Sequence, residues 1–258
     1  MKSDRDLLAV AEEAIDAGAA WLAGKGAGDE WAETRFKESG EEVTDADVEV
    51  ERLVTRVLRS RTPDVPVVGE ESADGALPPA RCWLLDPIDG TMNFTRRGPL
   101  YALSLAYVDR GEPTVGVVYA PALGRRWTAG PEGGVPHEPQ RAGDLSRAVV
   151  GVSGTGSRPG AATLIRLLLD RAYRTRMHGA MSLDLVGVAE GWLDACVCVG
   201  PKPWDVAAGV ALVRQRGLTV LGSGGRPFGW DSPVLLAGSE PVAGQLAELW
   251  GTADERQR

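Results

Sequence analysis

The spacing of apolar residues changes along the chain, and this change limits the folds that the sequence can adopt. Residues 4–23 and 45–60 carry apolar side chains at intervals of three and four, which is the spacing of amphipathic helices. Ser3 can cap the first predicted helix, and Thr44 can cap the second, with Asp47 three residues later in a capping-box pattern. From residue 65 onward the apolar residues form short runs separated by Gly, Pro and Asp. The chain therefore begins with two helices and continues with strands.

The short apolar runs predict two kinds of sheet. A largely antiparallel sheet is predicted from the runs at 65–69, 82–85, 101–108, 114–120 and 125–129. After a loop from about 130 to 143, elements alternate, with strands at 148–153, 192–199, 218–222 and 233–238 and helices at 162–172, 182–191, 204–217 and 245–250. We predict an α+β half over residues 1–143 and an α/β half over residues 144–258, which together form one catalytic unit of the α/β class.

The composition disfavours several classes of function. The formal net charge is −8, so the chain has no basic excess with which to bind nucleic acid. No window has the roughly 20 apolar residues of a membrane span, and the first residues lack the order of a secretory signal, so a cytoplasmic protein is expected. With two histidines, a His-built zinc or copper centre is disfavoured. Cys82, Cys196 and Cys198 are expected to be reduced and mostly buried.

Acidic residues follow several predicted elements at the points where these elements end. Glu70 and Glu71 follow the first predicted strand, Asp86 follows the second, and Asp205 opens the helix at 204–217. Ligand groups tend to gather at such ends, where the scaffold fixes them and leaves them reachable. Carboxylates that converge there repel one another unless cations lie between them, and oxygen ligands favour Mg²⁺ or Mn²⁺ over zinc. The sequence therefore predicts a divalent-cation site.

The segment DPIDGT places two acids three residues apart. The proline after Asp86 fixes its own φ and favours an extended Asp86, so the chain turns and the carboxylates of Asp86 and Asp89 and the carbonyl of Ile88 can face one point. Gly90 permits close backbone approach. Thr91 is expected to begin a short helix whose free N–H groups can bind a phosphate, with its hydroxyl placed to orient a water.

Each of these residues also has an ordinary structural interpretation. DPIDG alone is typical of a surface turn, and Asp205 alone is typical of a helix N-cap. Glu70 and Glu71 are compatible with solvated loop acids, and Asp47 with a residue that only caps its helix. The occurrence of all of them in one chain favours the cation site.

Three segments resemble the signature of the inositol monophosphatase family, namely VGEES at 68–72, WLLDPIDGTMNF at 83–94 and PWDVAAG at 203–209. The resemblance covers nearly the whole chain, through Phe36-Lys37, VTDAD at 43–47, GVVYAP at 116–121, GSR at 156–158 and GAMS at 179–182. DPIDGT with a later WD is more specific than a lone Gly-rich loop. The resemblance implies a layered αβαβα sandwich, a homodimer, and Mg²⁺-dependent, lithium-sensitive hydrolysis of a small phosphate monoester.

The resemblance also implies roles for individual residues around the metal. The implied metal ligands are Glu70, Asp86, the Ile88 carbonyl, Asp89 and Asp205. Two or three Mg²⁺ ions are implied, with Mn²⁺ as an alternative and Li⁺ as an inhibitor. Such ions activate water and stabilise both the attacking and the leaving oxygen of an in-line displacement, so no covalent enzyme intermediate is required.

The implied catalytic residues are Glu70 and Thr91, which activate the attacking water. Asp47 matches the acid that pairs with Thr91, and Lys37 matches a basic residue near the metal and its waters. Lys37 is also compatible with an ordinary solvated surface lysine. Neither Asp47 nor Lys37 is needed for the metal site itself.

The implied substrate-binding positions depart from the family pattern. They are Asp89, Gly90, Thr91, Gly179, Met181, Cys198 and Asp205, with Gly90 and Thr91 at the phosphate. Cys198 stands seven residues before the WD aspartate, where an acid that binds a ring hydroxyl is common, and a thiol is a weak hydrogen-bonding group. Met181 stands where a small residue is usual. Both residues are also compatible with simple packing.

These departures leave the reaction class in place and the substrate open. Inositol-phosphate-like, sugar and amino-alcohol phosphates all fit, and the alternatives are a histidinol-phosphate or a nucleoside or nucleotide phosphatase, including one of specialised metabolism. A phosphatase with an aspartate nucleophile is disfavoured, because its second aspartate lies two residues on and here the gap is three. A catalytically silent ligand-binding homologue is disfavoured because every implied metal position keeps an oxygen ligand.

Overall fold

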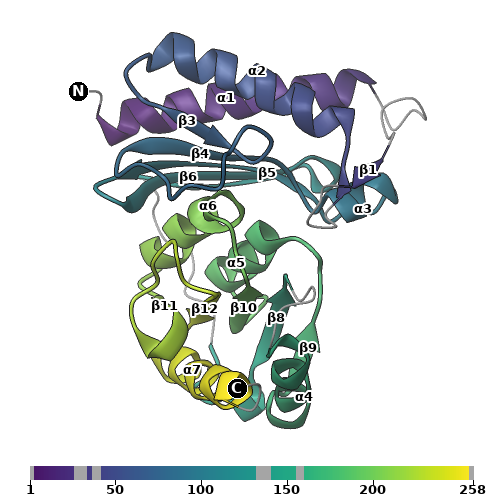
Figure 1. Cartoon of the computed structure of the whole chain (residues 1–258), viewed down its shortest axis with the longest axis vertical. Coiled ribbons are helices and arrows are strands. Elements are labelled where there is room, and N and C mark those ends of the chain that lie inside the picture. Colours follow the sequence, from purple (N-terminus) through teal and green to yellow (C-terminus); the bar gives the residue numbers. More distant parts are fainter. Residues whose placement is uncertain (1–2, 26–33, 37–41, 132–140, 155–159, 256–258) are drawn as a thin grey trace. The chain divides into compact units, whose positions relative to one another are not determined.

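The computed structural model describes residues 3–25, 34–36, 42–131, 141–154 and 160–255 (Figure 1). By their internal contacts the residues form two compact units, Met1–Gly133 with Pro203–Ala211, and Gly134–Lys202 with Leu212–Arg258. The first boundary lies within the predicted loop. The second unit is interrupted where Pro203–Ala211 returns to the first, so Asp205 belongs to the first unit and not to the second half in which we predicted it.

The two N-terminal helices form as predicted. Helix α1 spans Asp4–Lys25 and helix α2 spans Asp45–Arg61, and the two pack on each other and on one face of the first unit's sheet (Figure 1). Their apolar stripes are fully or almost fully buried, with Leu7, Ala11, Ile15, Val50, Val54 and Leu58 in the shared core. A large buried aliphatic side chain contributes about 1.5–3 kcal/mol. This core therefore anchors α2, the helix that carries Asp47.

The sheet of the first unit has the strand order β3-β4-β5-β6-β7. Its strands are β3 (Val67–Gly69), β4 (Cys82–Asp89), β5 (Ala102–Asp109), β6 (Glu112–Ala120) and β7 (Arg125–Ala129). Only β3 and β4 pair in parallel, which confirms the largely antiparallel sheet. A two-stranded pair that we did not predict is formed by β1 (Arg35–Phe36) and β2 (Glu42–Val43).

The two faces of this sheet differ. Trp83, Leu85, Leu103 and Leu105 belong to the core beneath α1 and α2. Because side chains alternate along a strand, Asp86 lies on the opposite face. That face receives the start of helix α6 (Pro203–Gln215), and a Cβ at Gly116 would stand only 2.7 Å from the carbonyl oxygen of Ala208. Close approach of α6 therefore requires glycine on β6.

The second unit contains a mixed sheet with the order β11-β12-β10-β8-β9. Its strands are β8 (Val149–Ser153), β9 (Arg174–Arg176), β10 (Ala195–Val199), β11 (Thr219–Leu221) and β12 (Val234–Gly238). Helices α4 (Ala161–Arg171) and α7 (Glu240–Glu255) pack with the sheet in one apolar core, and helix α5 (Met181–Glu190) contacts β8 and β10. The predicted alternation is confirmed except for β9, an edge strand without apolar residues.

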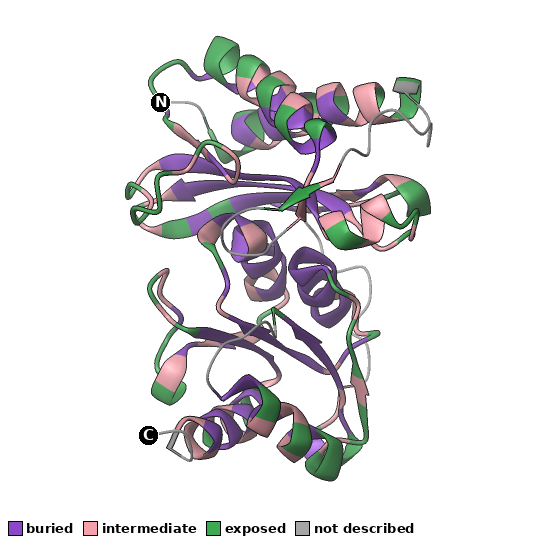
Figure 2. Ribbon diagram, turned by 45° about the vertical axis from the view of Figure 1, so that its right-hand side comes forward, coloured by how far each residue is buried: buried purple, intermediate pink, exposed green. Residues whose placement is uncertain are grey.

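The central strands of both sheets are buried, and the outward sides of α1, α2, α4 and α7 are exposed (Figure 2). Cys82, Cys196 and Cys198 are buried, as predicted, and form no disulfide with one another. Among the described helices, none combines the length and the apolar character needed to cross a membrane. The fold is thus of the α/β class with layered sheets and helices.

Candidate active site

Asp86 and Asp89 lie within strand β4, at a bulge. Asp86 is opposite Ser104 of β5 and Asp89 is opposite Ala102, so three steps along β4 match two along β5. We predicted that the chain would leave the strand after Leu85, and this is wrong. A bulge accommodates Pro87, which has no N–H for the ladder, and lets the strand continue to Asp89. The backbone N–H of Ile88 donates to Oδ1 of Asp86 at 3.0 Å.

The chain turns at Gly90, immediately after β4. Gly90 has a φ of +88°, a left-handed conformation that glycine adopts at little cost. Helix α3 (Thr91–Thr95) begins at the next residue, as predicted, and the N–H groups of Asn93 and Phe94 donate to the Gly90 carbonyl at 2.8 and 3.0 Å. The turn therefore brings Thr91 next to the two acids of the bulge.

The hydroxyl of Thr91 contacts both the bulge and helix α2. Its Oγ1 lies 2.9 Å from the carbonyl oxygen of Ile88 and 3.2 Å from Oδ1 of Asp47. The other oxygen of Asp47 accepts from the N–H of Thr44 at 2.8 Å and from its hydroxyl at 2.6 Å. Asp47 is thus both the predicted capping partner of Thr44 and the predicted partner of Thr91.

A second carboxylate on α2 holds the loop after β3. Glu51 is largely buried, and its Oε2 accepts from the N–H of Glu71 at 2.8 Å. A Cβ at Gly69 would stand 2.4 Å from this carboxylate, so any larger residue there would require the Glu51 side chain to move. The N–H of Glu70 donates to the carbonyl of Leu85 at 3.0 Å, which places Glu70 beside the strand that carries Asp86.

The acids of this region interact electrostatically. The pKa of buried Asp86 is raised well above its usual value, first by loss of solvation and then by repulsion from Glu70, Asp89, Asp205 and Asp47. Burial also raises the pKa of Asp47 to about 7, although its hydrogen bonds with Thr44 oppose the rise. The five acids come from α2, β4, α6 and the loop after β3. The sequence predicted these locations for Asp47, Asp205 and Glu70.

The side chains of the described residues do not by themselves form a metal site, since no three His, Cys, Asp or Glu groups among them are arranged to hold one ion. The acids nevertheless fit a divalent cation chemically. They are all oxygen donors of the kind that Mg²⁺ prefers. The mutual repulsion at Asp86 is what a cation would relieve.

The remaining predicted site residues fall elsewhere. Lys37 lies outside the described residues. Gly179, Met181 and Cys198 belong to the second unit. Met181 begins α5 and Cys198 lies on β10, and both side chains are buried, as expected of residues that pack. Their contact with substrate stays a prediction.

Residues 4–255 match the model of the inositol monophosphatase family. The chain belongs to this family. It is 37% identical over 231 residues to the probable inositol 1-monophosphatase ImpA of Mycobacterium tuberculosis, which covers 85% of each chain. It is also 37% identical over 201 residues to the histidinol-phosphatase of that organism, which covers 72% of this chain and 77% of the relative.

The solved structures show the same relationship. The IMPase of Thermotoga maritima superimposes with a TM-score of 0.83 at 25% identity, over 99% of this chain and 100% of the other. This likeness agrees with the predicted fold of the family. Family membership also makes the chain a phosphoric monoester hydrolase.

Two groups of residues near or beyond the site were not found by sequence reasoning. Glu51 stands four residues after Asp47 on α2, a spacing that places both side chains on one side of the helix. This spacing could have identified Glu51 from the sequence. In the second unit, His178 Nδ1 lies 2.6 Å from Oδ1 of Asp184, and the hydroxyl of Ser153 donates to the other oxygen of Asp184. Nothing in the spacing of these three residues indicated that they meet.

Proposed function

We propose that the chain hydrolyses a small phosphate monoester in a Mg²⁺-dependent reaction, with water as the nucleophile. The observation that carries the proposal is the burial of Asp86 among four further acids. A buried carboxylate in such surroundings is costly unless it is paired with positive charge. Asp47 and Thr91 next to these acids supply the groups that orient a water.

Two or three Mg²⁺ ions would be held by Glu70, Asp86, the Ile88 carbonyl, Asp89 and Asp205, with Mn²⁺ as an alternative and Li⁺ as an inhibitor. When bound, the cation would make water more acidic and offset the negative charge of the phosphoryl group. All five ligands belong to the first unit, with Asp205 contributed by the segment that returns to it.

The groups of the chain itself would bind, orient and move protons. Gly90 and Thr91 would present backbone N–H groups to the phosphate. The Thr91 hydroxyl, fixed by Asp47, would orient the attacking water, and Glu70 would accept its proton. Water oxygen forms the new bond to phosphorus as the ester P–O bond breaks, and the leaving alkoxide takes up a proton. Lys37 would add positive charge nearby.

A panel of phosphate monoesters tests this function directly. Wild type would release phosphate from at least one inositol, histidinol, sugar or nucleoside monoester in the presence of Mg²⁺, and Asp86→Asn would be slower by at least about 100-fold. Asp86→Asn keeps the size of the side chain and removes its charge. If no monoester is hydrolysed above the level of this variant, the hydrolase proposal fails.

The substrate is proposed only as a class. The relatives are named for both inositol-phosphate and histidinol-phosphate hydrolysis, so both are candidate substrates. Cys198 is the position that we expect to differ from enzymes that bind a ring hydroxyl with an acid. Cys198→Glu would shift the ranking of the panel toward polyhydroxylated substrates. An unchanged ranking would show that position 198 only packs.

We further propose that the chain forms a cytoplasmic homodimer, as the family resemblance implies. Light scattering on the purified protein would give twice the mass of 27.3 kDa that one chain has. A mass of one chain at concentrations used for activity would contradict the dimer. Cell fractionation would test the compartment.

A further inference from the structure

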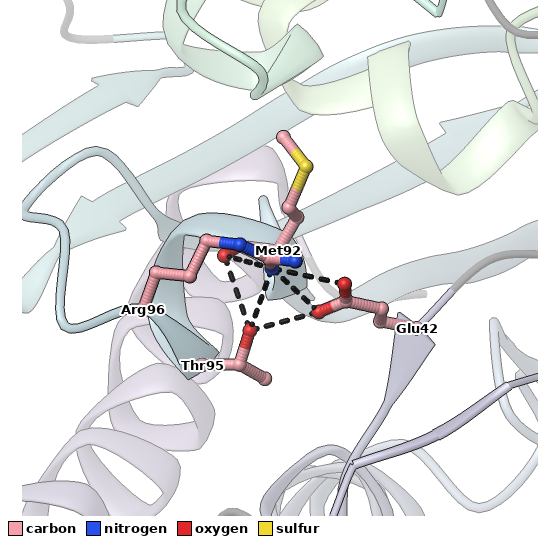
Figure 3. Close-up of polar contacts among 4 residues, drawn as sticks. All are labelled: Glu42, Met92, Thr95 and Arg96. Atoms are coloured by element: carbon pink, nitrogen blue, oxygen red, sulfur yellow. Dashed lines mark hydrogen bonds and ion pairs between the residues drawn. The ribbon is translucent and has the colours of Figure 1, made fainter.

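Helix α3 is held at both ends by one short segment of the chain. At its first residue, the Thr91 hydroxyl contacts Asp47. At its other end, the hydroxyl of Thr95 donates to Oε2 of Glu42 at 2.8 Å, and Nη1 of Arg96 donates to the same oxygen at 2.9 Å (Figure 3). Glu42 lies in β2 and Asp47 in the first turn of α2, so residues 42–47 contact both ends of α3.

In this contact the acceptor, Glu42, is much less exposed to solvent than the donor, Arg96. The Glu42 side chain is 11% exposed, whereas that of Arg96 is 61% exposed. Nη1 of Arg96 also donates to the carbonyl of Met92 at 2.9 Å, and the Thr95 hydroxyl lies 3.1 Å from that carbonyl. The Glu42 carboxylate therefore fixes the positions of the Thr95 hydroxyl and the Arg96 guanidinium. Arg96 in turn donates to the Met92 carbonyl, one of the carbonyls that the end of a helix leaves without a backbone partner.

Helix α3 needs such support. It spans only five residues, and a helix of this length is unstable without contacts from the rest of the protein. None of its residues is fully buried, although the Phe94 ring contacts Tyr101 and the Asn93 amide donates to the Leu100 carbonyl. Polar contacts at its two ends therefore help to determine where the Thr91 hydroxyl lies.

We infer that Glu42 is a positioning residue for Thr91, because it holds the end of α3 while Asp47 holds the beginning. The inference rests on the proposed function, in which the Thr91 hydroxyl orients the attacking water. Glu42 itself would touch neither substrate nor metal. Its removal would leave substrate binding largely intact and lower the rate of the chemical step, since small displacements of reacting groups are costly to rate.

The first test compares Glu42→Ala with Glu42→Gln and with a matched control. Glu13→Ala removes another charge-assisted contact of the first unit, between Glu13 on α1 and Arg61 on α2, far in sequence from α3. We expect Glu42→Ala to lower kcat about tenfold with KM changed by less than about twofold. Glu42→Gln keeps an acceptor oxygen and would recover most of kcat, and Glu13→Ala would leave kcat unchanged. Equal kcat for Glu42→Ala and Glu13→Ala would overturn the inference.

A second measurement does not depend on turnover. Hydrogen exchange of the Asn93 and Phe94 amides reports on α3, because both donate to the Gly90 carbonyl. Glu42→Ala would speed their exchange about tenfold, and Glu13→Ala would not. Unchanged exchange would overturn the inference even if wild type hydrolysed no monoester, whereas faster exchange without any turnover would refute the proposed function alone.

Two further variants cover the case in which Glu42→Ala fails to fold. Thr95→Val and Arg96→Met each remove one donor to Glu42 and leave its carboxylate in place. Each would reproduce part of the fall in kcat and part of the rise in amide exchange, with KM again nearly constant. If neither variant changes either quantity, α3 does not depend on Glu42.

Discussion

Oγ1 of Thr91 lies within hydrogen-bonding distance of Oδ1 of Asp47, a residue 44 positions earlier in the chain. The same oxygen is also 2.9 Å from the Ile88 carbonyl, but one hydroxyl proton can serve only one acceptor at a time. If the Ile88 carbonyl binds a cation, the proton goes to Asp47. The lone pairs of Thr91 are then available to accept a hydrogen bond from water, which is the role that the proposed mechanism needs.

Removal of this hydroxyl should impair the reaction more than the fold. Thr91→Val keeps the shape of the side chain, and we expect kcat to fall about 100-fold, the size of effect typical for loss of a group that aids proton transfer. The loss of stability should be only about 1 kcal/mol. Thr91→Ser is the matched control and should keep most of kcat. Steady-state kinetics and thermal unfolding check both, and a Thr91→Val enzyme with normal kcat would contradict the role.

Gly69→Ala should disturb the loop that carries Glu70. The new methyl group would stand 2.4 Å from the Glu51 carboxylate, which would have to release the N–H of Glu71. We expect a loss of about 1–3 kcal/mol in the free energy of unfolding and a clear fall in kcat. Gly111→Ala is the comparison variant. It introduces backbone strain, because the φ of Gly111 is +83°, but its new methyl group would contact no atom of the described residues. Equal kcat for the two variants would show that the position of the loop that carries Glu70 does not affect catalysis.

How much of this could be predicted from the sequence depends on the range of the interactions. The helices α1 and α2, the antiparallel sheet and the Gly90 turn follow from local spacing and turn chemistry, and all are present in the structure. The bulge at Pro87 was missed because an apolar run followed by Asp-Pro fits both a strand end and a bulge. β9 was missed because its residues, Arg174–Arg176, pair only at a sheet edge and show no apolar alternation.

The candidate site divides in the same way. Asp86, Asp89 and Thr91 were found because the motif places them together in sequence. The contacts of Glu42 with Thr95 and Arg96 join positions more than 50 residues apart, and nothing in the local sequence indicates them. The assignment of Asp205 to the first unit likewise depends on how α6 packs against Gly116.

Ser104 should be replaceable without loss of stability. Its hydroxyl is fully buried and has no hydrogen-bond partner in the described part of the chain. A buried polar group without a partner costs about 1–3 kcal/mol, so Ser104→Ala should leave the metal-free protein equally or more stable in denaturant. Thr62→Val, which removes a buried hydroxyl bonded to Leu58 and Trp83, should destabilise it. A destabilised Ser104→Ala would reveal a partner that binds this hydroxyl.

The pair of His178 and Asp184 should make stability depend on pH. The hydrogen bond to Asp184 raises the pKa of His178, while burial and Arg176 oppose the rise. A histidine whose pKa is higher in the folded state contributes stability that is complete below its unfolded value of about 6.5 and is lost as the pH rises through the folded value. The Tm of wild type minus that of His178→Asn should therefore be larger at about pH 5.5 than at about pH 9. A constant difference would show that the pKa of His178 is the same in the folded and the unfolded state.

We propose that Glu70, Asp86, Asp89 and Asp205, together with the Ile88 carbonyl, bind the divalent cation on which hydrolysis depends. Anomalous scattering from a crystal soaked in Mn²⁺ tests whether these groups bind the cation. We predict at least one anomalous peak in contact with Asp86 and Asp89 and with Glu70 or Asp205, which would be absent in a crystal of Asp86→Asn. Wild-type crystals without a peak among these side chains, at a Mn²⁺ concentration that supports phosphate release, would contradict it.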